Sequence, residues 1–370
     1  MSHLLSLDAY RHAVRVRDLT DPAQGPHAMQ LLVSDVVSAL CTAWGASALL
    51  RRDNPVVPLE DNYDRLRYPA DGVARDARYT RYVSERLVLR TQTSAMIPPL
   101  LASLDDTQLG DVLLACPGIV YRRDQIDRLH SGEPHQLDLW RLRRGPTLTP
   151  TDLREMIAQV VRAVLPGWEH RVSPAEHPYT EQGLQIDVLA EGVPIEIGEC
   201  GLAHPELLSA AGVTDDVSGL AMGIGLDRVL MLRKGVPDIR LLRSDDQRVA
   251  SQMRDLSPYR AVSRLPPVRR DLSLMVDSDV TAEELGDRVR QALGPDAESV
   301  EEIAIRSETP YDALPLAARA RMGAAAGQKN VLLSVVLRHP THTLTHAQAN
   351  VLRDRVYAAL HAGTRHEWAG

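Results

Sequence analysis

The chain contains no phenylalanine, although its 370 residues include ten tyrosines and four tryptophans. A soluble protein of this length ordinarily contains about a dozen phenylalanines. Tyrosine and tryptophan are present in useful numbers, so aromatic side chains in general are not avoided. The shortage therefore concerns phenylalanine itself, and it calls for an explanation specific to that amino acid.

Other absences exclude whole classes of protein. The three cysteines are odd in number and far apart, which argues against a disulfide framework and favours a reducing compartment. No apolar run is long enough to span a membrane, and the N-terminus lacks the basic segment and apolar core of a secretory signal. The formal net charge of −7 leaves any nucleic-acid contact to a local basic patch. We therefore expect a cytoplasmic enzyme or binding protein that has no membrane partner.

The segment from Gly219 to Arg233 has the pattern of a glycine-punctuated strand that runs directly into a helix. Its glycines remove side chains where a backbone must turn tightly or lie close to a ligand. Arg228 stands at the start of the helix, aimed back at the glycines, and its planar, permanently charged guanidinium suits a polyphosphate or a purine face. Taken alone, this spacing favours an ordinary packing corner with a surface arginine. Other segments of the chain must therefore decide between a packing corner and a ligand site.

Residues 118–140 have the pattern of an antiparallel hairpin with a long polar tip. We expect the first strand to present Arg122 and Asp124 on one face, because side chains two residues apart leave a strand on the same side. The tip carries His130. The return strand presents two further polar side chains on a common face, Gln136 and Asp138.

Together, the two segments resemble motifs 3 and 2 of the class II aminoacyl-tRNA synthetases, most closely in their phenylalanyl-tRNA synthetase form. In that form the hairpin reads Tyr-Arg-x-Asp/Glu, then His, then Phe-His-Gln-x-Glu. The resemblance implies that Arg122 bridges the amino-acid carboxylate and the α-phosphate of ATP, with Arg228 as the second catalytic cation. It also implies that Glu196 holds Mg²⁺. The remaining residues of the implied ATP side are Asp124, His130 and Gly225.

Three further segments match the family and would form the amino-acid side. The family reads Arg-Thr-His-Thr-Ser where this chain has Gln92 for the histidine, and Phe-Pro-Phe-Thr-Glu where it has His177 and Tyr179. Glu199 stands where relatives usually have a small residue, and Asp138 stands where they have glutamate. The amino-acid side implied by the resemblance comprises Gln92, Ser94, Gln136, Asp138, His177, Tyr179, Glu199 and Ala221.

The expected fold is α+β, with the antiparallel sheet and flanking helices of a class II synthetase over residues 1–247. Within it we predict an amphipathic helix over His27–Ala43, whose match to class II motif 1 is weak, and another over 151–165 behind an N-cap at Thr149. A linker over 248–264 ends at two prolines. Residues 265–370 read as βαββα with a short closing strand. They resemble the ferredoxin-like anticodon-binding domain of phenylalanyl-tRNA synthetases.

The resemblance implies ATP-dependent activation of an amino acid as its adenylate and transfer to a tRNA, with tRNA for phenylalanine as the expected partner. ATP and Mg²⁺ are the expected cofactors, and a monomer or homodimer is the expected assembly. The substitutions on the amino-acid side predict weak or altered selectivity for phenylalanine. Two other functions stay open, a tRNA-independent amino-acid activator and a non-catalytic tRNA-binding regulator.

Residues other than phenylalanine stand even where the family carries it, at Pro134, His177, Met222 and Leu241. This pattern indicates that the residue itself is avoided, and two hypotheses explain it. The chain must be translated when phenylalanine-charged tRNA is scarce or the usual synthetase is inhibited, or phenylalanine codons are read with a different amino acid.

Overall fold

The computed structural model describes residues 4–123, 127–190, 192–261 and 265–365. The chain forms two compact units. The first contains residues 1–122, 133–236 and 252–259, and the second contains 123–132, 237–251 and 260–370. Both units are therefore built from separate stretches of chain, and the domain limits expected at 247 and 265 stay a prediction. No described helix has the length and apolar character needed to cross a membrane.

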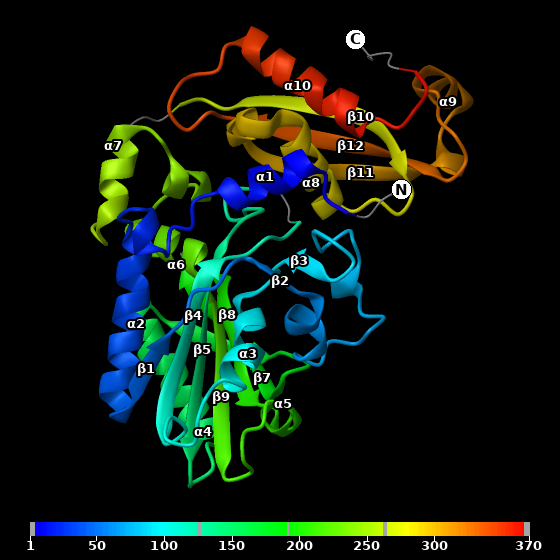
Figure 1. The fold of residues 1–370 in the computed structure, drawn as a ribbon. Coiled ribbons are helices and arrows are strands. Elements are labelled where there is room, and N and C mark those ends of the chain that lie inside the picture. Colours follow the sequence, from blue (N-terminus) through cyan, green and yellow to red (C-terminus); the bar gives the residue numbers. More distant parts are fainter. Residues whose placement is uncertain (1–3, 124–126, 191, 262–264, 366–370) are drawn as a thin grey trace. The chain divides into compact units, whose positions relative to one another are not determined.

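A seven-stranded sheet forms the centre of the first unit, with the order β1-β4-β5-β9-β8-β7-β6 (Figure 1). Only β1 and β4 pair in parallel, and every other neighbouring pair is antiparallel. The strands are β1 (Ser47–Leu50), β4 (Asp111–Ile119), β5 (His135–Arg144), β6 (His170–Pro174), β7 (Thr180–Ala190), β8 (Val193–Ala203) and β9 (Val217–Gly225). The predicted antiparallel sheet is confirmed.

Helices pack against both faces of this sheet. Helices α2 (Ala28–Trp44), α4 (Pro150–Val164) and α6 (Leu226–Lys234) contact one another and β4, β5 and β8. The predicted helix over His27–Ala43 is confirmed as α2, and the predicted cap of α4 is confirmed because Thr149 and Asp152 form a capping box. On the other face, α3 (Ile97–Leu101) and α5 (Pro205–Ala210) pack over Trp140 and Leu142 of β5.

The hairpin predicted over residues 118–140 is present as β4 and β5, but its first strand is shorter than expected. Strand β4 ends at Ile119, so Arg122 lies beyond the strand, and Asp124 lies outside the described residues. Pro134, opposite the strand end, has no N–H with which to continue the ladder. The Tyr121 N–H instead donates to the carbonyl of Arg90, 2.9 Å away. That bond turns the chain toward β3 (Leu87–Leu89), which pairs with β2 (Val56–Pro58).

The second unit contains a three-stranded antiparallel sheet of order β10-β12-β11. Its elements are β10 (Val268–Asp277), α8 (Ala282–Leu293), β11 (Val300–Pro310), α9 (Leu316–Met322), β12 (Gln328–Leu337) and α10 (His346–Leu360). Apolar residues of both long helices and all three strands form one core. The three expected strands and both long helices follow one another in the expected order, but the short helix α9 lies where the prediction had a loop. Among the described residues no fourth strand closes the sheet, so a ferredoxin-like fold stays a prediction.

Candidate active site

Residues of the predicted site lie side by side on one face of the sheet, across β5, β9 and β8. Asp138 of β5 is opposite Gly223 of β9, and Gly223 is opposite Glu199 of β8. The adjacent row contains Trp140, Ala221 and Gly201 in the same order. Residues opposite one another in a ladder point to the same side of the sheet. The three strands therefore place Asp138 and Glu199 on either side of a glycine, on the face that also carries Trp140.

Glycines keep the middle strand of this face free of side chains. A Cβ atom on Gly223 would have Asp138 Oδ2 as its nearest contact, at 3.8 Å, and one on Gly225 would lie 3.8 Å from the Ile197 carbonyl. Both are ordinary contact distances, so packing does not demand glycine there. Gly198 differs, because a Cβ there would lie 2.3 Å from the Gly223 carbonyl oxygen. The glycines at 223 and 225 leave the backbone of β9 bare between β5, which carries Asp138, and β8, which carries Glu199. A ligand can closely approach this bare backbone, which we call the floor of the site.

Asp138 is buried, and both of its carboxylate oxygens accept hydrogen bonds. Ser94 Oγ donates to Oδ2, and Trp140 Nε1 donates to Oδ1 over 2.7 Å. Burial raises the pKa of Asp138 to about 6, while Ser94, Trp140 and His177 act in the opposite direction. At neutral pH this carboxylate is ionised but poorly solvated. A substrate ammonium group is the kind of partner that relieves such a penalty.

Gln92, predicted to replace the family histidine, belongs to a short network that fixes the wall beside Asp138. Its Oε1 accepts from the hydroxyl of Tyr68 over 3.0 Å, and its Nε2 donates to the Asn62 carbonyl over 3.0 Å. Gln136 Oε1 accepts from the Thr93 N–H over 3.2 Å. Ser94 and the two glutamines are therefore brought together around Asp138, and their role in binding the amino acid stays a prediction. Tyr68 and Asn62 were not predicted, because nothing in their local sequence indicates a long-range partner.

His177 and Tyr179 also lie at this site. His177 Nε2 is 2.6 Å from Glu199 Oε2, so the two residues that depart from the family pattern contact each other. Tyr179 stacks on Trp140 with ring centroids 6.3 Å apart, and its ring lies 5.7 Å from that of His177. The hydrogen bond from His177 is the main cause of the lowered pKa of Glu199. An aromatic cluster and a charged pair thus occupy adjacent parts of the same site.

The residues predicted for the nucleotide form a charged group at the edge of this face. Arg228, on the first turn of α6, donates from a terminal guanidinium nitrogen to the Glu196 carbonyl oxygen over 2.6 Å. It therefore reaches the neighbouring strand β8. Arg122 donates from Nε to the Thr91 carbonyl oxygen over 3.1 Å. Two guanidinium groups are thus anchored through the backbone, and both lie close enough to Glu196 to lower its pKa.

Glu196 fits the predicted Mg²⁺ role. Partial desolvation and the neighbouring Glu199 raise its pKa, although Arg228 and Arg122 act in the opposite direction, and a bound cation would further stabilise the ionised form. Within the described ranges no three His, Cys, Asp or Glu side chains converge as a complete metal site. A magnesium ion at Glu196 would therefore take its remaining ligands from nucleotide phosphates and water, which is its usual behaviour beside substrate phosphates.

His130 lies in residues 123–132, which group with the second unit. There its Nδ1 is 2.7 Å from Asp127 Oδ2. Its predicted role on the ATP side stays a prediction, as does that of Asp124, which lies outside the described residues.

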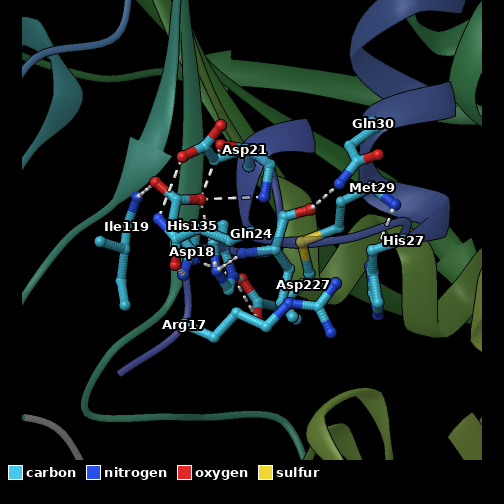
Figure 2. A network of polar contacts seen from close by, with 12 residues as sticks. Arg17, Asp18, Asp21, Gln24, His27, Met29, Gln30, Ile119, His135 and Asp227 are labelled. Carbon is cyan, nitrogen blue, oxygen red and sulfur yellow. Dashed lines mark hydrogen bonds and ion pairs between the residues drawn. The ribbon is translucent and has the colours of Figure 1, made fainter. Parts of the chain in front are cut away.

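A buried polar network behind the site was missed by the sequence analysis (Figure 2). Asp227 precedes Arg228, and its carboxylate accepts from the His135 N–H and lies 3.1 Å from His135 Nδ1. On the other side of the ring, His135 Nε2 accepts from the Leu19 N–H over 3.0 Å. Asp18 Oδ2 accepts from the Ile119 N–H over 3.1 Å. The network joins the start of α6 to the return strand of the hairpin, and so links Arg228 to the strand of Gln136.

The chain is similar in sequence to known proteins. Residues 31–253 match the family described as tRNA synthetases class II core domain (F). The chain is 32% identical over 259 residues to the phenylalanine--tRNA ligase alpha subunit of Limosilactobacillus reuteri (strain DSM 20016), covering 65% of this chain and 73% of that protein. For the protein of the same name from Lacticaseibacillus casei (strain BL23), identity is 34% over 206 residues, covering 52% and 58% of the two chains.

Proposed function

This chain belongs to the class II tRNA synthetases, and on that premise we propose that it is a ligase that activates an aromatic amino acid with ATP and transfers it to a tRNA. The observation that supports this proposal best is the arrangement of a buried carboxylate, Asp138, on the sheet face with two cations, Arg122 and Arg228, held by backbone carbonyls near Glu196 at its edge. Attack of a carboxylate on an α-phosphate requires positioning and neutralisation of phosphate charge more than proton transfer.

Each residue of the face has a distinct task in this reaction. Asp138, with Gln136 beside it, holds the ammonium group of the amino acid and so fixes its carboxylate. Arg122 neutralises charge where that carboxylate meets the α-phosphate, and Arg228 binds the nucleotide from the rigid start of α6. Glu196 would hold Mg²⁺, which when bound neutralises phosphate charge. The bare backbone at Gly223 and Gly225 admits the substrates to the sheet.

Amino-acid-dependent exchange of pyrophosphate into ATP tests the proposal directly. The purified chain is expected to catalyse exchange without a second kind of subunit. Arg228→Ala should reduce exchange about 100- to 1,000-fold, because it removes a cation from the developing phosphate charge. Arg233→Ala, on the same helix, is the matched control and should stay close to wild type. Full exchange in the Arg228 variant, or none in the wild type with any amino acid, would refute the proposal.

The transfer step requires a tRNA, and we propose tRNA for phenylalanine as the acceptor. The relatives' names support this choice, and the second unit is the part of the chain available for binding RNA beyond the catalytic core. Charging of bulk tRNA by the wild-type chain tests it. Exchange without charging of any tRNA would instead support a tRNA-independent amino-acid activator, which is the second candidate function.

A further inference from the structure

The row Asp138–Gly223–Glu199 places an acidic residue at each end of a bare strand. Neighbouring strands are about 4.8 Å apart, so the Cα atoms of Asp138 and Glu199 are separated by about 10 Å across β9. The proposed reaction needs one carboxylate to bind the ammonium group of the amino acid, and the buried Asp138 has that role. The second carboxylate at the far side of the floor has no task in binding the amino-acid backbone.

His177 contacts one carboxylate oxygen of Glu199, and the other oxygen is available to a ligand. Its Oε2 lies 2.6 Å from His177 Nε2, and within the described parts of the chain no residue donates to Oε1. The side chain of Glu199 is 42% exposed, whereas that of His177 is 10% exposed. The histidine therefore orients the carboxylate, and one oxygen remains as an acceptor.

The surroundings of this acceptor select flat, ring-bearing ligands. Tyr179 stacks on Trp140 at an interplanar angle of 24°, and its centroid lies 6.3 Å from that of Tyr68. Aromatic walls favour a ring through offset and edge contacts. Ala221, opposite Trp140 in the ladder, has a small side chain and therefore leaves room for a ring beside these aromatic residues. A substrate ring bounded by these groups would meet an acceptor at Glu199 instead of an apolar wall.

We propose that the preferred substrate is an aromatic amino acid whose ring carries a hydroxyl group, and that Glu199, oriented by His177, accepts a hydrogen bond from this hydroxyl. This inference rests on the proposed function and narrows its substrate class. A plain phenyl ring would cover the carboxylate and leave its Oε1 without a donor, which carries a desolvation cost for that oxygen. A ring hydroxyl supplies a charge-assisted bond in its place.

The complete lack of phenylalanine in the chain is a second, independent observation that supports a ring-hydroxylated substrate. An enzyme that loads a ring-hydroxylated analogue onto tRNA for phenylalanine places that analogue at phenylalanine codons. A protein without phenylalanine is translated unchanged under those conditions. For an enzyme that loads phenylalanine itself onto that tRNA, the same absence has a benefit only when phenylalanine-charged tRNA is scarce or the usual synthetase is inhibited.

Pyrophosphate exchange with phenylalanine and its ortho, meta and para ring-hydroxyl isomers tests the substrate class. At least one hydroxylated isomer should exceed phenylalanine in kcat/KM by about 100-fold or more, as sites built around a hydroxyl group reject analogues that lack it. The double variant His177→Phe, Glu199→Gly should reverse the preference and gain activity toward phenylalanine. A gain of activity also shows that the variant is folded. Glu155→Gln, an exposed glutamate on α4, is the matched control and should keep the wild-type preference.

The outcomes separate this inference from the proposed function. If phenylalanine is the best substrate, the inference is overturned and the proposed function stands. If a hydroxylated isomer is best but the double variant keeps that preference, the role of Glu199 and His177 is overturned. If no amino acid supports exchange, the proposed function fails and the inference fails with it.

Discussion

Replacing Asp138 by asparagine should stabilise the first unit and abolish the binding of the amino acid. The carboxylate is buried between Ser94 and Trp140, and an amide of the same shape can keep both contacts. Its oxygen still accepts from the Trp140 indole, and its nitrogen can donate to the Ser94 hydroxyl. The substitution therefore removes charge from the site while leaving its packing and hydrogen bonds in place.

The magnitude follows from the raised pKa. Moving the pKa of an aspartate from 3.8 to about 6 disfavours the ionised form in the folded protein by about 3 kcal/mol. Between these two values the folded state binds more protons than the unfolded state, so stability falls as pH rises through this window. The full penalty is present above the folded pKa. Asp138→Asn should therefore stabilise the protein by up to about 3 kcal/mol at pH 7.5, and by almost nothing near pH 4.

Denaturant unfolding followed by tryptophan fluorescence is a suitable assay. Trp44, Trp140 and Trp168 all belong to the first unit. The quantity to compare is the difference in unfolding free energy between variant and wild type, measured across the pH range. Asp215→Asn, at an exposed position, is the matched control and should change stability by less than about 0.5 kcal/mol.

Activity should change in the opposite direction. Asp138 must be ionised to hold an ammonium group, so wild-type kcat/KM for the amino acid should fall about tenfold per pH unit below about pH 6. The variant should lose at least about 100-fold at all pH values, with little change in the KM for ATP. A stability difference that does not vary with pH, or a variant that keeps its amino-acid affinity, would refute this account of Asp138.

Two further predictions concern the supports of the site. Asp227→Ala removes the acceptor of two buried N–H groups of His135 and should cost about 3 kcal/mol or more in unfolding free energy, whereas Asp227→Asn should cost less. Gly198→Ala should lower stability by about 1–3 kcal/mol, because its Cβ would overlap the Gly223 carbonyl. Gly223→Ala should melt like wild type yet raise the KM for the amino acid, since its methyl group fills the bare floor beside Asp138. Equal melting losses in the two glycine variants would contradict the distinction drawn between them.

Much of the fold was predictable because its patterns are local. The helix over α4 follows from apolar spacing and from the cap at Thr149, and the hairpin follows from two apolar strands around a polar tip. The end of β4 was not predictable, because it depends on a hydrogen bond from Tyr121 to Arg90, far away in the sequence. The grouping of residues 123–132 with the second unit has the same origin in long-range contacts.

The resemblance to a family identified most residues of the site, but it could not show how they meet. Asp138, Gln92 and Ser94 were each predicted, and the structure adds that Ser94 donates to Asp138. Asp227 and His135 were missed because each has an ordinary local explanation, an acid on the first turn of a helix and a histidine at the start of a strand. The antiparallel register of β5 and β9, which pairs Gln136 with Gly225, brings them together.

The contact between His177 and Glu199 shows why two departures from a family pattern must be judged jointly. A histidine in place of an aromatic wall, taken alone, polarises the site and weakens binding of an apolar ring. A glutamate in place of a small residue, taken alone, crowds the site with a charge. Their separation of 22 residues conceals the fact that the two side chains lie 2.6 Å apart. As a pair they hold one carboxylate oxygen and leave the other as the acceptor that we propose for the substrate. A site with two unrelated defects should bind every aromatic amino acid poorly, whereas a site with a paired acceptor should bind one class of them well.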